Sequence, residues 1–304
     1  MRSGVLGLDI DAYGAEGQAA ALADFMEAAA LRRQSVTFSG LEEAIKDHGW
    51  GEIDNGLFIT GDEQMDRAMQ WPDRVRSLIM QRASILGANY PFRIRANALQ
   101  LKARHTRKHS SYERLLILTI AHSWGYSGKP RPDVLFERLV VGALKNAGFR
   151  SAGIGTGTRA SKRFENALAE AGRQVGISTM SSPSPVRRSA KDEKVDVLSV
   201  VNWRDPRPGR ISLITQATVG KSGSWMRKLK EPEPPKWKNY LLEKMAPLSA
   251  LAVPHHVDDR HLTDLLAVER GTVLDRLRLA PLLGEVVDGE PDMRAWFDRL
   301  DIEL

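Results

Sequence analysis

Two short apolar runs joined by a tight turn constrain the fold of this chain more than any other feature. The first, residues 195–203, is rich in β-branched residues, and the second, residues 210–218, alternates as it approaches Gln216. Between them, residues 205–209 read DPRPG, a combination that favours a turn. The pattern predicts a β-hairpin. Such a hairpin would place Asp196 at the start of one strand and Gln216 near the end of its neighbour.

The segments on either side of this hairpin predict a helix and two further strands. Residues 133–147 carry a wide apolar stripe at helical spacing, with Asp133 as the expected N-cap and Glu137 beside the stripe. Residues 247–254 are apolar and suit another strand against the hairpin, and residues 271–280 suit a strand that runs into a helical turn. Together these patterns predict an α/β fold.

The order of these elements resembles the PD-(D/E)xK nuclease superfamily, the restriction-endonuclease-like fold. The core of that family is a helix with a glutamate, then a hairpin with Asp on one strand and Glu-x-Lys or Gln-x-Lys on the next, then a second helix. Glu137, Asp196 and Gln216 match the first three positions in the same order. The resemblance implies a central mixed sheet flanked by helices, and it makes these residues the expected catalytic and metal-binding set.

The chemistry of that family explains why such residues would be used. Phosphodiester hydrolysis needs one or two hard divalent cations, Mg²⁺ or Mn²⁺, and these cations prefer oxygen ligands. Glu137 and Asp196 would supply charged oxygens, and Gln216 a neutral one. The resemblance therefore implies a metal-dependent nuclease that cleaves nucleic acid, with DNA as the expected substrate.

One position departs from the family pattern. The family lysine should stand two residues after Gln216, where this chain has Thr218. One possibility is that Lys228 or Lys221, from the segment that follows, supplies the positive charge of the missing lysine. The alternative is that the protein is a catalytically silent subunit that binds nucleic acid or a protein partner. If Ser224 caps a helix, Lys228 would lie one turn into that helix and could point back towards the metal.

Three further motifs resemble restriction-endonuclease-like proteins of bacterial defence loci. They are LGxxYPF at residues 86–92, Pro254-His255, and LDRxR at residues 274–278. The resemblance spans residues 70–285 and implies a role in antiviral defence, with a partner protein of such a system as a possible binding partner.

The chain divides into two expected domains. Residues 1–110 predict a mainly helical domain, through amphipathic stretches at residues 17–33 and 73–86. This domain suits a winged-helix-like module, or equally a packing or partner-binding unit. Residues 111–304 predict the restriction-endonuclease-like nuclease domain.

Composition limits the function classes and the location. The net charge of +6 is compatible with a polyanionic partner. Arg187, Arg188 and Lys221 are the expected contacts to the nucleic-acid backbone, with both arginines in a polar segment at residues 178–190. The absence of cysteine excludes disulfides, thiolate zinc sites and cysteine nucleophiles. No apolar run approaches the ~20 residues that cross a bilayer, and no signal peptide is expected, so we expect no membrane association and a cytoplasmic location.

Two other motifs have simpler interpretations than a site. The glycine-rich segment at residues 153–158 lacks the Gly-Lys-Ser/Thr ending of a P-loop, and a flexible turn is the better interpretation. His255, His256 and His261 lack the spacing of a zinc motif.

Overall fold

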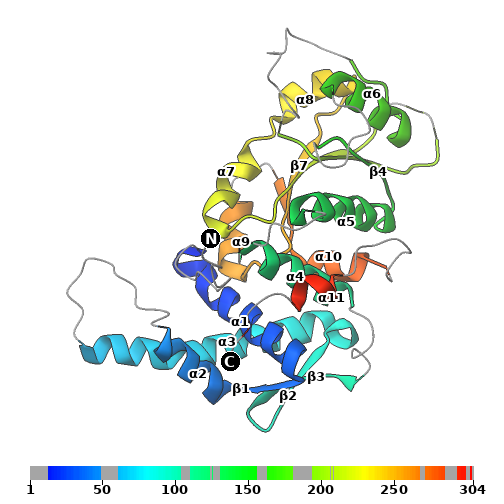
Figure 1. Ribbon diagram of the computed structural model, residues 1–304. Helices are drawn as coiled ribbons and strands as arrows, with labels where there is room; N and C mark the ends of the chain where they lie inside the picture. The colour runs from blue at the N-terminus through cyan, green and yellow to red at the C-terminus, as the bar shows by residue number, and fades with distance from the viewer. Residues whose placement is uncertain are drawn as a thin grey trace, which may run out of the picture.

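A five-stranded mixed sheet forms the frame of the C-terminal half of the protein (Figure 1). The computed structural model describes residues 13–48, 61–103, 110–123, 125, 131–155, 163–180, 194–205, 207, 209–267, 271–284, 293–298 and 302. The strands follow one another across the sheet in chain order: β4 (Phe149–Gly153), β5 (Val197–Val201), β6 (Ser212–Ala217), β7 (Leu248–Ala252) and β8 (Gly271–Leu274).

The predicted hairpin is confirmed, and the pairing around it determines which residues share an edge. β5 pairs antiparallel with β6, with Val197 opposite Thr215, whereas β6 pairs parallel with β7, with Gln216 opposite Leu251. β4 is antiparallel to β5, and β8 is parallel to β7. The first residue of β5 and the last residue of β6 therefore lie next to each other at the same end of these two strands, which brings Asp196 and Gln216 together.

Helices bury both faces of this sheet, and the α/β prediction is confirmed. One face packs against α4, α5 and α10, because Val197, Leu213 and Ala250 belong to the same buried cluster as those helices. The other face packs against α6 and α8 through Leu198 and Ile214, and against α7 and α9 nearer β7 and β8. The helix bounds are α4 (Ser111–Ser123), α5 (Pro132–Asn146), α6 (Phe164–Val175), α7 (Trp225–Lys230), α8 (Pro234–Leu241), α9 (Asp259–Leu266), α10 (Arg276–Leu282) and α11 (Arg294–Phe297), with short 3₁₀ turns at η2 (Gly87–Asn89) and η4 (Ser222–Ser224).

The described residues of the N-terminal part form three helices and a small antiparallel sheet in the order β1-β3-β2. Two of these strands meet in a two-residue turn at Ala96 and Asn97, which have φ angles of 46° and 59°. Positive φ at both positions suits a right-handed hairpin twist, but alanine is an unusual residue there, so the turn has little sequence signal. The elements are α1 (Gly14–Arg33), β1 (Ser35–Thr37), α2 (Phe38–Asp47), α3 (Gly61–Leu86), β2 (Phe92–Arg95) and β3 (Ala98–Leu101).

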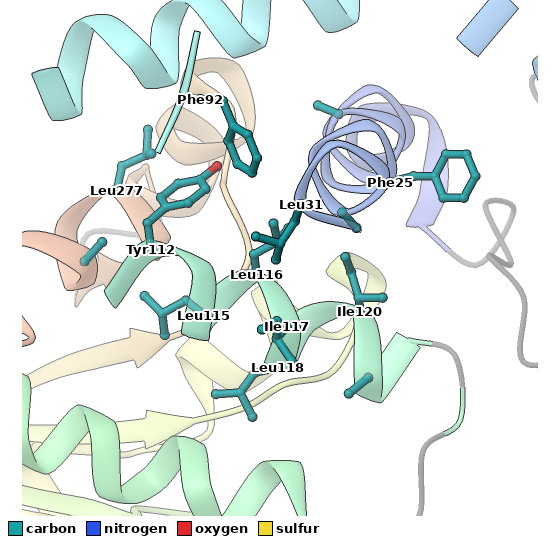
Figure 2. Packing of buried hydrophobic residues seen from close by; sticks show 14 of the residues in the cluster. Phe25, Leu31, Phe92, Tyr112, Leu115, Leu116, Ile117, Leu118, Ile120 and Leu277 are labelled. Carbon is teal, nitrogen blue, oxygen red and sulfur yellow. The ribbon is translucent and has the colours of Figure 1, made fainter. Parts of the chain in front are cut away.

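Helix α4 lies between the N-terminal helices and the sheet (Figure 2). Its residues from Tyr112 to Ala121 are all buried, and residues 115–121 are apolar except for Thr119. Phe25 and Leu31 of α1 belong to the same buried cluster as this helix, and so do Phe136 of α5 and Leu277 of α10. A single hydrophobic cluster thus extends from the N-terminal helices to the sheet.

A buried ion network also connects these two parts of the chain. Arg276 donates two hydrogen bonds to the carboxylate of Asp24, at 2.7 and 2.8 Å. Arg82 pairs with Asp24 at 2.9 Å and with Glu27 at 2.8 Å. The hydroxyls of Tyr90 and Tyr112 donate to Glu27 at 2.5 and 2.7 Å. Because every charge here has a partner of opposite sign, the network can be buried without leaving an isolated ion.

The motifs that resemble defence-locus proteins meet in this network. Tyr90 comes from the first motif, and Arg276 from the third. The guanidinium of Arg276 also donates to the backbone oxygen of Pro254, from the second motif, at 2.8 Å. Asp275, beside Arg276, caps α10 by accepting from the backbone of Arg278. In this structure, the three motifs hold the N-terminal helices against the sheet.

Among the described residues, none of the helices has the length and apolar character needed to cross a membrane.

Candidate metal and phosphate site

A pocket of about 630 Å³ lies at the end of the sheet where β6 ends and β5 begins. It is lined by the three residues predicted as metal ligands, by the threonine in place of the family lysine, and by two basic residues from α4 and α7. These six residues are Glu137, Asp196, Gln216, Thr218, His122 and Lys228. Residues from five separate segments of the chain, α4, α5, the start of β5, the end of β6 and α7, therefore converge on one cavity.

Gly155 brings the two carboxylates together. Asp196 Oδ1 and Glu137 Oε2 lie 2.7 and 2.8 Å from the point that a Cβ atom would occupy on Gly155. Two oxygens that close to one point are near enough to bind the same cation or two adjacent ones. Glu137 is only 7% exposed, and it lies on the side of α5 that faces the sheet. A carboxylate pair of this kind gives the pocket its acidic wall.

Backbone hydrogen bonds hold Asp196 in place at the start of β5. Its carbonyl oxygen accepts from the amides of Ile154 and Gly155, at 2.8 and 3.0 Å, and its own amide donates to Thr215 at 2.9 Å. The side-chain oxygen Oδ2 accepts from the amide of Ala217 at 2.8 Å. Asp196 is thus fixed between β4 and β6, and its other oxygen faces Gly155 and Glu137.

Gln216 contributes a buried amide to the same edge. Its nitrogen Nε2 donates to Glu231 Oε2 at 3.1 Å. Its oxygen Oε1 is buried and has no hydrogen-bond partner among the described residues. Buried polar atoms are almost always satisfied by protein, water or an ion, so this oxygen points to a ligand at the site.

Thr218 and Lys228 complete the pocket on the side of α7. The Thr218 hydroxyl accepts from the amide of Gly220 at 3.1 Å, so it stabilises the turn after β6. Trp225 opens α7 after Ser224 and donates to the backbone oxygen of Gly220 at 2.8 Å. The buried Trp225 ring fixes this short helix against the core, and Lys228 on the same helix lines the pocket.

Further charged residues surround the acidic wall. Arg131 pairs with Asp133 at the start of α5, and both line the pocket together with Lys194. Burial lowers the pKa of His122 below 6.5; Asp133 opposes this effect, and Lys221 and Lys228 add to it. His122 is therefore mainly a neutral imidazole near pH 7, and it can donate or accept a hydrogen bond.

The start of α5 differs from its prediction. Asp133 was the expected N-cap, but the helix begins at Pro132, and Arg131 occupies the cap position without a side-chain bond. Proline suits the first helical position because its φ angle is already helical and its missing N–H is not needed there. Asp133 instead lies in the first turn and pairs with Arg131.

The structure describes only some of the other residues singled out from the sequence. Arg187 and Arg188 lie outside the described residues. The ammonium of Lys221 lies 5.4 Å from the centre of the Tyr13 ring. His255 is buried, and its Nε2 lies 3.1 Å from the backbone oxygen of Val219, so it supports the turn after β6.

The donor atoms of the pocket fit a hard divalent cation. Two carboxylates and one amide oxygen are the ligand types that Mg²⁺ and Mn²⁺ prefer, and Mg²⁺ commonly keeps several waters in proteins. No group of three or more His, Cys, Asp or Glu side chains with metal-binding geometry occurs in the described part of the chain. The candidate site has two such side chains, and its third oxygen comes from Gln216.

Replacing Gly155 with alanine is expected to disrupt this arrangement. The added Cβ would lie less than 3 Å from both carboxylate oxygens and 3.1 Å from Asp196 Cβ, so the acidic wall must open. We expect Mn²⁺ affinity, measured by isothermal titration calorimetry, to fall by about 10-fold or more. Gly142→Ala is the matched control, because Gly142 lies in α5 with nothing within 4 Å of its Cβ position. The control should keep wild-type affinity; an unchanged affinity in Gly155→Ala would contradict the assigned geometry.

A scan of protein-family models found no match for this chain, and searches of curated proteins and of solved structures returned no match either.

Proposed function

We propose that this protein is a metal-dependent nuclease with a restriction-endonuclease-like core, which hydrolyses phosphodiester bonds of nucleic acid, with DNA as its substrate. The observation that carries the proposal is the convergence of Glu137, Asp196 and Gln216 at one pocket, with Lys228 on its rim. The four residues come from α5, the start of β5, the end of β6, and α7. That order, a helix, a hairpin and a second helix, supports the family resemblance.

In the proposed reaction, three of these residues bind the metal and the basic residues interact with phosphate. Glu137, Asp196 and Gln216 would hold Mg²⁺ or Mn²⁺, which when bound polarises the phosphate and activates water. The Lys228 ammonium would stabilise the negative charge that develops on the phosphate oxygens. Arg131 and Lys194, which line the same pocket, would attract the neighbouring phosphates of the chain.

The first test is the effect of replacing Lys228 on cleavage. We expect Lys228→Ala to lower the rate of Mg²⁺- or Mn²⁺-dependent cleavage by about 10²-fold or more, the scale of a lost charge-stabilising group. The assay compares purified proteins on single- and double-stranded DNA and RNA, with and without the metal. Lys221→Ala is the matched control, since Lys221 lies against the Tyr13 ring and does not line the pocket. A greater loss in Lys221→Ala than in Lys228→Ala would contradict the assignment of Lys228.

One observation favours a second function, a silent nuclease-fold subunit that binds nucleic acid or a protein partner. Thr218 stands where the family has its lysine, and its hydroxyl is engaged by the backbone of Gly220. A silent subunit would bind nucleic acid at low salt without cutting it, and its affinity would fall steeply as salt increases. Binding without cleavage by the wild type, under every metal condition, would favour this alternative.

We also propose a place for the protein in antiviral defence. It depends on the motifs that include Tyr90, Pro254 and Arg276, and these residues belong to the buried network or lie next to it. The motifs therefore support a shared architecture, and the proposed activity depends on the pocket alone.

A further inference from the structure

We infer that Glu231 is a positioning residue for the candidate cation site, and that it turns the Gln216 side chain so that the amide oxygen faces the cation. The inference rests on the proposed function, because it assigns a role towards the same cation. It adds a residue that stands outside the family pattern.

The contact that carries the inference joins the end of α7 to the end of β6. Glu231 follows α7, and its Oε2 accepts from Gln216 Nε2 at 3.1 Å. A carboxylate only accepts hydrogen bonds, so the nitrogen end of the amide must face it. The opposite end of the amide is then the oxygen, which is buried and has no hydrogen-bond partner among the described residues.

A second contact orients the Glu231 side chain. Its other oxygen, Oε1, pairs with Arg227 one helical turn earlier. The Glu231 side chain is 19% exposed, so it is partly shielded from water. With one oxygen on Arg227 and the other on Gln216, the carboxylate has a defined orientation, and it resists rotation of the amide.

This arrangement explains why a glutamine, and not an acid, stands at position 216. A carboxylate at that position would lie next to the Glu231 carboxylate. Two negative charges so close repel each other, and this repulsion raises the pKa of one carboxyl of the pair. The amide avoids the repulsion and still presents an oxygen. The cation side of the pocket then has two negative charges, on Glu137 and Asp196, which match one divalent cation.

The test measures Mn²⁺ binding by the full-length protein with electron paramagnetic resonance, so no cleavage is needed. Glu231→Met removes the acceptor and keeps the length of the side chain, and we expect Mn²⁺ affinity to fall by about 10-fold or more. Glu233→Met is the matched control, because it removes an exposed acid two residues further along the chain and leaves both contacts of Glu231 in place. It should change the affinity little.

A charge swap separates positioning from a general effect on folding. In the double variant Gln216→Glu with Glu231→Gln, the amide and carboxylate exchange places, so the hydrogen bond is restored and the cation gains a charged ligand. We expect this variant to bind Mn²⁺ at least as tightly as the wild type. Binding as weak as that of Glu231→Met would overturn the inference.

The remaining outcomes distinguish the inference from the proposed function. If wild-type protein binds no Mn²⁺, the proposed metal site itself fails. If the wild type binds Mn²⁺ and Glu231→Met binds it equally well, the role of Glu231 alone is wrong. An equal loss in Glu233→Met and Glu231→Met would also overturn the inference, because the effect would then come from the loss of a negative charge after α7 and not from the amide.

Discussion

Replacing Asp196 with asparagine is expected to abolish metal-dependent cleavage, with a loss of about 10³-fold or more. Asparagine keeps the shape of the side chain, and its oxygen can still accept the hydrogen bond from the Ala217 amide. The variant therefore removes the charge of a metal ligand while it leaves the hairpin intact. Such a charge is central to the site, because the cation and its ligands stabilise the transition state directly. Cleavage is measured with excess Mg²⁺ and again with Mn²⁺.

The control for this variant is Asp205→Asn, at the opposite end of the same hairpin. Asp205 pairs with Arg207 in the turn and lies far from the pocket edge of the strands. The Asp205→Asn variant should cleave at the same rate as the wild type. Cleavage that survives in Asp196→Asn would show that the activity comes from another site or from a contaminating nuclease.

Replacing Arg276 with methionine is expected to lower the free energy of unfolding by about 3–5 kcal/mol, the usual cost of breaking a buried ion pair from one side. Arg276 is fully buried, and its loss removes two hydrogen bonds to Asp24 and one to the Pro254 backbone. The measurement is urea unfolding followed by circular dichroism. Arg278→Met is the control, because Arg278 lies on the same helix and is exposed. A loss no larger in Arg276→Met than in this control would contradict the role of the network.

The effect of Arg276→Met should also depend on pH. Burial by itself raises the pKa of Asp24, but Arg276 and Arg82 outweigh it and lower that pKa from 3.8 to about 2. A carboxyl with a lowered pKa stabilises the fold above about pH 4, and this contribution is lost as the pH falls towards 2. The difference in unfolding free energy between wild type and variant should therefore shrink as the pH is lowered from 7 to 3.

Four of the five strands of the main sheet, all but β4, could be predicted from the sequence because their signals are local. Residues 195–203 and 210–218 are short apolar runs on either side of a strong turn, and they form β5 and β6. The same kind of signal predicted β7 and β8. The small N-terminal sheet has weaker signals, since its hairpin turns at Ala96 and Asn97 without a typical turn residue at the first position.

The candidate site was only partly predictable, because much of it depends on contacts between distant segments. Glu137, Asp196 and Gln216 follow the order of a known pattern, and the structure places them around one pocket. Gly155 belongs to a segment whose composition predicts a flexible turn, and its close approach to both carboxylates appears only when β4 lies beside β5. Glu231 likewise has no local signal that links it to Gln216.

The buried network shows the same limit. Asp24, Glu27, Arg82 and Arg276 each occur in helices where charged residues are usually exposed, and nothing in their local sequence indicates burial. They become partners only when α1, α3 and α10 pack around α4. His122 has no sequence signal for a related reason: it lies in the last turn of a largely apolar helix, outside the predicted motif, and it lines the pocket only when α4 packs beside α5 and β6.

The most direct test of the central claim is a crystal structure of the protein grown with Mn²⁺, with anomalous diffraction measured at the manganese absorption edge. We expect an anomalous peak in the pocket, with oxygens of Glu137, Asp196 and Gln216 at about 2.0–2.6 Å from the ion, the range of metal–oxygen bonds. The contradictory result is a pocket without an anomalous peak at millimolar Mn²⁺ and in the presence of bound nucleic acid, or a peak held by other residues.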